Sequence, residues 1–120
     1  FAFDSTDPRA LEEFRSYVEA GFTAAIGYND GSALHLYPLI QRLDMTVGTD
    51  FSVAGFDDIS AAKLAIPPLT TVRVDRGRLI REAFSLLDEL AGTAAPVRLT
   101  RTLETELMIR RSALPPSRGG

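Results

Sequence analysis

Apolar residues occur in blocks that alternate between two spacings along the first ninety residues. Three short runs, at residues 22–28, 51–56 and 69–74, are apolar on both faces or rich in β-branched residues, as buried strands are. The segments between them repeat apolar residues every three to four positions, which is typical of helices with one buried face. Those segments are residues 8–20, 32–42, 60–65 and 76–91. The alternation predicts an α/β layered fold with a mostly parallel sheet.

Polar residues and prolines mark the expected ends of these elements. Asp7 followed by Pro8 predicts the start of the first helix, because the carboxylate accepts an orphan N–H and proline has none to leave unpaired. Gly21 is expected to end that helix. Pro38 lies inside the predicted helix 32–42 and should kink it near its middle.

The last quarter of the chain departs from the alternating pattern. Asp75 is expected to cap the long helix 76–91, and Gly92 to end it. Residues 93–96 are predicted to form a loop, and residues 97–103 and 105–112 two short strands. Residues 118–120 are expected to form a frayed tail.

Composition narrows the function classes. The chain has 120 residues, enough for one ordinary domain, and 45% of them are hydrophobic. A net charge of −3 and a pI near 5.1 argue against a nucleic-acid-binding surface. With no cysteine, disulfides and thiolate metal sites are excluded, and no apolar run approaches the length of a membrane span. Because the chain starts at Phe1 without a signal-peptide pattern, we expect it to be an internal part of a longer or processed protein.

Two predicted strands end on polar residues. Tyr28-Asn29-Asp30 follows the first, and Phe56-Asp57-Asp58 follows the second. In an open α/β sheet, ligands bind beyond the carboxyl ends of the strands. An Asn side chain donates and accepts hydrogen bonds, a carboxylate can accept two hydroxyls, and an aromatic ring can stack on a sugar or a base. This chemistry suits a small polyol or a purine.

Each polar residue also has a purely structural interpretation. Asp30 and Asp58 stand where the following helices need N-caps, and we expect both to be caps. For Asn29 and Asp57, a ligand contact and a simple turn role remain open.

Other residue types give no catalytic or metal-binding pattern. His35 is the single histidine and is expected to be a surface or packing residue. The serines lack the glycines of a nucleophile elbow, and there is no glycine-rich phosphate loop. Glu104 and Glu106 are expected to pair with Arg110 and Arg111. We therefore expect no enzymatic activity, no cofactor and no metal.

Four segments resemble LacI/GalR-family transcription regulators. They are FTAAIGYND at 22–30, FSVAGFDDIS at 51–60, PPLTTVRV at 67–74 and LETELMIRRSALPP at 103–116. Their order and spacing also match that family. The pairing of GFDDI with PPLTTVR is the most specific feature, because related periplasmic sugar-binding proteins share the fold but usually lack it.

The resemblance implies a two-lobed periplasmic-binding-protein-like type I fold. Residues 1–67 would form an α/β segment of the C-terminal lobe, and residues 68–96 a crossover strand and helix of the N-terminal lobe. Residues 97–116 would be strands that return to the C-terminal lobe, and residues 117–120 a tail. The implied function is effector sensing and dimerisation in a cytoplasmic, DNA-binding transcription regulator.

The resemblance also implies partners and site residues. Asn29 and Asp57 fall on effector-contact positions, with apolar contact from Tyr28 or Phe56. The positions expected at the dimer interface are Leu34, Lys63 and Leu64. The implied partners are a sugar or purine-like effector, a second copy of the chain, and operator DNA bound only through an upstream headpiece outside these residues. No membrane partner is implied.

The sequence departs from the family pattern at several positions. Pro38 interrupts a helix that is normally continuous, and His35 and Asp44 stand where glycines are common. Gly48-Thr49 replaces a proline-acidic pair, and Glu104 replaces a proline. These departures affect helix geometry and the dimer surface more than the cleft.

A second class of function also fits the sequence. A periplasmic-type solute-binding protein of a transporter is the alternative function; an upstream signal peptide would favour it, and an upstream helix-turn-helix would exclude it.

The wide apolar stripe of helix 76–91 needs a partner. We expect the chain to associate through this helix and strand 69–74.

Overall fold

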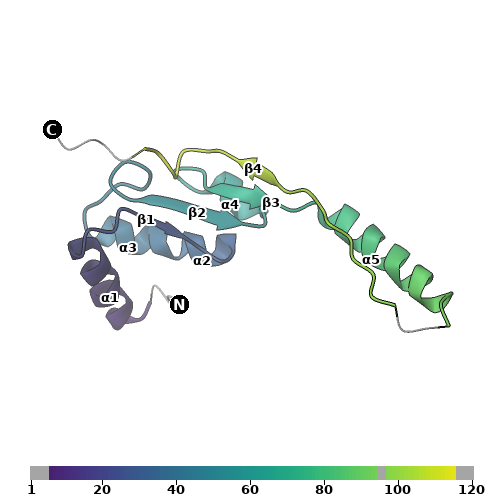
Figure 1. The fold of residues 1–120 in the computed structure, drawn as a ribbon. Helices are drawn as coiled ribbons and strands as arrows, with labels where there is room; N and C mark the ends of the chain where they lie inside the picture. Colours follow the sequence, from purple (N-terminus) through teal and green to yellow (C-terminus); the bar gives the residue numbers. More distant parts are fainter. Residues whose placement is uncertain (1–5, 95–96, 116–120) are drawn as a thin grey trace.

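The computed structural model describes residues 6–94 and 97–115 and forms a mixed α/β layered fold around one sheet (Figure 1). The strands are β1 (Ala24–Ile26), β2 (Ser52–Phe56), β3 (Thr70–Arg73) and β4 (Glu106–Met108), in the order β1-β2-β3-β4. The helices are α1 (Pro8–Glu19), α2 (Asp30–Leu34), α3 (Leu36–Arg42), α4 (Ser60–Leu64) and α5 (Arg76–Ala91). β1, β2 and β3 are parallel and β4 is antiparallel to β3, which confirms the predicted fold class.

The ends of α1 form as the sequence predicts. The Asp7 carboxylate accepts the Arg9 N–H at 2.9 Å, and Pro8 occupies the first helical position. Gly21 has a φ of 91°, in the left-handed region that glycine adopts at no steric cost. The N–H of Phe22 then reaches the carbonyl of Tyr17 at 3.1 Å, which completes a Schellman motif.

Pro38 divides the predicted helix 32–42 into two. α2 ends at Leu34 and α3 begins at Leu36, with His35 at the junction. Proline has no N–H to donate to the carbonyl four residues earlier, and its ring clashes with that carbonyl. At the third position of α3 the missing N–H is one that a helix leaves unpaired in any case, so the chain restarts the helix there.

The predicted strand 97–103 is wrong, and the predicted strand 105–112 is limited to β4. Residues 97–104 run beside α5, where no strand edge is available for pairing (Figure 1). Arg101 holds this segment to α5 through ion pairs with Glu82, at 3.7 Å, and with Glu89. The apolar start at Phe1–Phe3, the end of the loop at 95–96 and the tail at 118–120 lie outside the described residues.

The core lies between one face of the sheet and helices α1 to α4. The largest buried apolar side chains are Phe51, Leu39, Ile40, Leu69 and Val53. The rings of Phe14 and Phe51 meet edge to face at 5.1 Å and join α1 to the start of β2. The opposite face of the sheet carries exposed apolar side chains, among them Ile26, Phe56 and Leu107.

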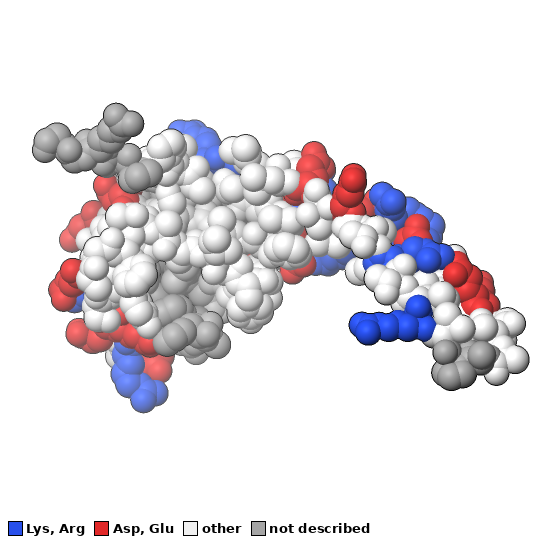
Figure 2. Space-filling model, viewed as in Figure 1, with Lys and Arg blue, Asp and Glu red and all other residues white. Residues whose placement is uncertain are grey.

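α5 extends away from this body as an arm (Figure 1). The molecule measures 63 × 28 × 25 Å with a radius of gyration of 18.9 Å, against about 14 Å for a compact chain of this length. α5 has no buried residue, and its apolar stripe is 41–65% exposed. Figure 2 shows charges of both signs along the arm and few over the middle of the viewed face of the body.

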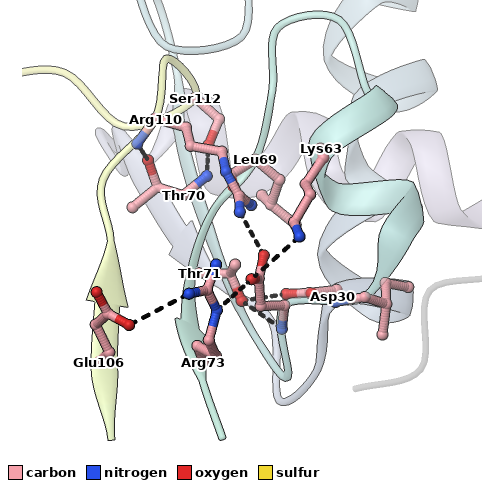
Figure 3. A network of polar contacts seen from close by, with 11 residues as sticks. Asp30, Lys63, Leu69, Thr70, Thr71, Arg73, Glu106, Arg110 and Ser112 are labelled. Carbon is pink, nitrogen blue, oxygen red and sulfur yellow. Dashed lines mark hydrogen bonds and ion pairs between the residues drawn. The ribbon is translucent and has the colours of Figure 1, made fainter. Parts of the chain in front are cut away.

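Asp58, just beyond β2, contacts basic side chains of three other segments, and Figure 3 labels these partners, Lys63, Arg73 and Arg110. The side chain of Asp58 is only 2% exposed and receives hydrogen bonds from Arg73 of β3, at 2.8 Å, and from Arg110 beyond β4. The ammonium of Lys63 lies 3.9 Å away. Burial alone would raise the pKa of Asp58, but the hydrogen bonds from Arg110 and Arg73 and the nearby positive charges outweigh it and lower that pKa.

Ser112 joins β2 to β3 on the same side of the body. Its hydroxyl donates to the carbonyl of Val53 at 2.6 Å and accepts the N–H of Thr70 at 2.7 Å. The N–H of Val53 in turn donates to the carbonyl of Ser112 at 2.7 Å. The segment after β4 therefore fixes the spacing of the two central strands.

The lowered pKa of Asp58 predicts an acid-dependent loss of stability. The stabilisation that ionised Asp58 contributes is fully present above the pKa of an Asp in the unfolded chain, about 3.9. It is lost as the pH falls through the lower pKa that Asp58 has in the folded protein. Asp58→Asn should therefore cost about 2 kcal/mol in urea unfolding at pH 7, and the difference from wild type should shrink below about pH 4. Asp88→Asn, at an exposed carboxylate of α5, is the control. An equal difference at pH 3 and pH 7 would contradict this account.

The bare stripe of α5 predicts association of the chain in solution. Leu79, Ile80, Phe84, Leu87 and Leu90 form the stripe. β3 is paired on both edges, so strand 69–74 could contribute to this contact only through its side chains, and that contribution stays a prediction. We expect concentration-dependent sedimentation, weakened by Phe84→Glu with Leu87→Glu. Ser85→Glu adds one negative charge on the opposite face of α5 and should leave association intact. A wild-type chain that is monomeric throughout would overturn this expectation.

Candidate functional site

The carboxyl ends of β1 and β2 meet at one edge of the sheet, as predicted. The two strands are parallel neighbours in which Ile26 pairs with Ala54. Asn29 lies three residues beyond Ile26, and Asp57 lies three residues beyond Ala54. Both residues therefore follow parallel neighbouring strands at the same end of the sheet.

Asn29, rather than Asp30, caps α2. Its Oδ1 accepts the Ser32 N–H at 2.8 Å, and the Ser32 hydroxyl completes a capping box. Because a backbone N–H fixes Oδ1, the Nδ2 group must point elsewhere. Within the described residues Nδ2 has no hydrogen-bond partner, so Asn29 can cap the helix and still donate to a ligand.

The prediction that Asp30 is a cap is wrong, because this side chain turns into the body. Asp30 is completely buried and accepts the N–H of Ile59 at 2.8 Å and the hydroxyl of Thr71. The prediction for Asp58 is also wrong. Ile59 is the N-cap of α4 and makes no side-chain cap, while Asp58 pairs with Arg73 and Arg110.

Asp57 keeps its carboxylate at the surface. Its side chain is 34% exposed, and Oδ1 lies 3.8 Å from the guanidinium of Arg76 in the first turn of α5. The residue has a φ of 108°, in the left-handed region that non-glycine residues rarely adopt. Its N–H donates to the carbonyl of Val72 at 2.8 Å, which holds the turn against β3.

A polar groove of about 1010 Å³ opens beside Asp57, between the body and the arm. Both acidic and basic side chains line it, so a ligand there would meet donors and acceptors together. The charged residues of the lining are Asp57, Asp58, Lys63, Arg73, Asp75, Arg76, Arg78, Glu104 and Glu106.

The two aromatic candidates lie apart from this groove. Tyr28 is 74% exposed and borders a separate apolar hollow of about 410 Å³ beside the edge strand β1. Phe14, Tyr17, Phe22 and Phe51 supply the other rings of that hollow. Phe56 ends β2 on the uncovered face of the sheet. The structure therefore groups Asp57 with Arg76, and Tyr28 with an apolar surface.

The expected pairing of Arg110 with Glu104 or Glu106 is wrong. Glu106 instead pairs with Arg73 at 3.3 Å, and Arg110 turns inward to Asp58 and to the carbonyl of Leu69. A sequence signal for this exists. Alternation along the last strand places Arg110 and Ser112 on the same face as the half-buried Met108. Arg76, at the mouth of the groove, has no comparable signal.

The three expected dimer residues lie on two helices that pack together, α2 and α4. Leu34 is half-buried in α2, while Lys63 and Leu64 of α4 are exposed. His35 follows Leu34 at the exposed helix junction.

In the parts of the chain that the structure describes, no group of three or more His, Cys, Asp or Glu side chains could hold a metal ion. In residues 6–94 and 97–115, no helix has both the length and the apolar character needed to cross a membrane.

Comparisons with known proteins agree with this fold. Residues 3–113 match the family of periplasmic binding protein-like domains. The lactose operon repressor of Rhizobium radiobacter is 35% identical over 96 residues, which cover 78% of this chain and 82% of that protein. The transcriptional repressor PurR of Vibrio vulnificus is 33% identical over 88 residues, which cover 73% of this chain and 26% of that repressor.

Solved structures give the same result. The dimeric Lac repressor with an 11-residue C-terminal deletion is 30% identical, with a TM-score of 0.74 over 89% of this chain and 40% of that one. The transcriptional regulator CelR in complex with cellobiose is 33% identical, with a TM-score of 0.72 over 88% of this chain and 32% of that one. The chain thus spans about a quarter of PurR and well under half of either regulator structure. It belongs to the family of periplasmic binding protein-like domains, as part of a LacI-type transcription regulator.

Proposed function

We propose that this chain is the effector-sensing and dimerisation part of a cytoplasmic, ligand-controlled transcription regulator, and that it catalyses no reaction. The observation that carries the proposal is the contrast between two adjacent carboxylates at the end of β2. Asp58 is buried and fully paired, whereas Asp57 is exposed at the mouth of a polar groove. An exposed acceptor on a rigid sheet edge is well placed to bind a ligand.

The ligand in this proposal is a small sugar or a purine-like molecule. Asp57 would accept two hydrogen bonds from hydroxyl groups, and the Nδ2 group of Asn29 would donate one. Phe56 or Tyr28 would offer an apolar surface. The complex of CelR with cellobiose supports a sugar as the first class to test.

The proposed mechanism uses the two parts of the molecule. Residues 1–67 would belong to the C-terminal lobe, residues 68–96 would cross to the N-terminal lobe, and residues 97–116 would return, with a tail at 117–120. The contact between Asp57 and Arg76 spans the body and the arm at this crossing. A ligand that binds Asp57 would replace that contact and shift the orientation of the lobes.

The proposed macromolecular partners are a second copy of the chain and operator DNA. The copies would meet through Leu34, Lys63 and Leu64, and DNA would bind an upstream headpiece outside these residues. The dimeric Lac repressor and the HTH-type repressor PurR support both points. Because the relatives named above are repressors, they favour a regulator over the alternative of a transporter's solute-binding protein.

Ligand binding should depend on Asp57. In calorimetric titrations of the full-length protein with monosaccharides, disaccharides and purines, at least one compound should bind. Asp57→Ala should weaken its binding by about tenfold or more, because hydrogen bonds to a charged group are lost. Asp88→Ala, on the exposed surface of α5, should bind as wild type does. Equal affinities for wild type and Asp57→Ala would refute this role.

Dimerisation should depend on Leu64, which is 79% exposed on α4. Leu64→Glu would place a charge in a desolvated contact and should weaken the dimer of the full-length protein by about tenfold in sedimentation equilibrium. Arg15→Glu alters an exposed position of α1 and serves as the control. If Leu64→Glu dimerises like wild type, the interface lies elsewhere.

A further inference from the structure

We propose that Asp30, Gly55 and Thr71 form a buried clamp that positions the turn carrying Asp57. We call these three residues the Asp30 clamp. Its role in ligand binding rests on the proposed function, whereas its effect on the turn can be measured without a ligand. Asp30 and Thr71 would act through the backbone of residues 57–59 and would touch no ligand themselves.

The clamp holds two successive amides of the turn. Oδ2 of Asp30 accepts the N–H of Ile59 at 2.8 Å, and Oδ1 accepts the hydroxyl of Thr71. The Thr71 oxygen in turn lies 3.4 Å from the N–H of Asp58 and accepts from it. Figure 3 shows Asp30 and Thr71 meeting inside the body. The N–H of Asp57 donates to the carbonyl of Val72, so three consecutive N–H groups are anchored.

Gly55 makes this contact possible. It pairs with Thr71 across β2 and β3, so the carboxylate of Asp30 must cross β2 at Gly55 to reach the threonine hydroxyl. A Cβ on Gly55 would lie 2.3 Å from Oδ1 of Asp30 and 3.1 Å from its Cα. Any side chain at this position would displace the carboxylate. The glycine of β2, the carboxylate of α2 and the hydroxyl of β3 therefore form one geometric unit.

The turn needs this support because its backbone is unusual. Asp57 and Asp58 have φ values of 108° and 52°, so two consecutive non-glycine residues adopt the left-handed region. Such conformations persist only where the surroundings hold them. In the described residues Asp30 makes no ion pair, and hydrogen bonds alone offset its complete burial. Burying a carboxylate costs free energy, and Asp30 hydrogen-bonds to the turn that carries Asp57, so a positioning role fits.

Amide hydrogen exchange of the full 120-residue chain tests the clamp. In wild type, the Ile59 amide should exchange slowly and Asp57 should show the strong intraresidue amide-to-Hα NOE of a positive φ. Thr71→Val keeps the side-chain shape but removes the hydroxyl. It should speed exchange at Asp58 and Ile59 by about tenfold relative to the core amides of Val53 and Leu69.

Two further variants separate positioning from general stability. Thr71→Ser restores the hydroxyl and should keep exchange at Asp58 and Ile59 within about twofold of wild type. Gly55→Ala removes no hydrogen-bonding group but displaces the carboxylate, so it should act as Thr71→Val does. Equal acceleration at Val53, Leu69, Asp58 and Ile59 would reduce the clamp to a general structural role. Fast exchange of the Ile59 amide in wild type would overturn the proposal even if every variant unfolds.

A second measurement connects the clamp to the ligand. For a monosaccharide, disaccharide or purine that binds the wild-type full-length protein, Thr71→Val should weaken binding by about tenfold and Thr71→Ser should not. Unchanged affinity in Thr71→Val would show that the clamp does not serve the ligand. If no compound binds wild type, the proposed function fails while the exchange result still decides the clamp.

Discussion

The ion pairs of Asp58 are the interaction on which the structure at the carboxyl end of β2 depends. Three basic side chains, from β3, from α4 and from the segment after β4, converge on this one buried carboxylate. Removing a carboxylate from water is costly, and several charged donors are needed to offset that cost. All three are directed at Asp58, whereas in residues 6–94 and 97–115 the carboxylate of its neighbour Asp57 has only the long contact with Arg76. Two adjacent identical residues thus differ in role through their surroundings alone.

The apolar surface of the molecule is likewise divided into a covered part and an uncovered part. One face of the sheet is closed by helices, while the other exposes Ile26, Phe56 and Leu107, and α5 buries nothing. Soluble domains seldom leave apolar surface of this extent uncovered. PurR is much longer than this chain, which covers about a quarter of it. We therefore expect the bare surfaces to contact further protein or a second copy.

Local chemistry predicted much of the fold, and long-range contacts account for most of the errors. Asp7 with Pro8, Gly21, and the polar ends of β1 and β2 behave as the sequence suggests, because each depends on a few neighbouring residues. Asp30 and Asp58 look like caps locally, but their partners lie far along the chain: Thr71 is 41 residues from Asp30, and Arg110 is 52 residues from Asp58. Residues 97–103 have strand-like composition but lie beside a helix, so no strand can pair with them. Local composition shows neither the distant partners of Asp30 and Asp58 nor the helix that lies beside residues 97–103.

Arg76 links the groove to the arm, because its guanidinium contacts Asp57 from the first turn of α5. Two chain segments join the body to the arm, one between β3 and α5 and one that leads back into β4 (Figure 1). A contact across such a crossing resists rotation of the arm only weakly when the charges are 3.8 Å apart and exposed to water. A ligand that hydrogen-bonds to Asp57, as proposed, would therefore lose little free energy by breaking this contact. Asp58 would remain fixed by Arg73 and Arg110, so the turn would keep its place while the arm moved. In this proposal binding and movement are separable, because Asp57 would serve the ligand and Asp58 serves the fold.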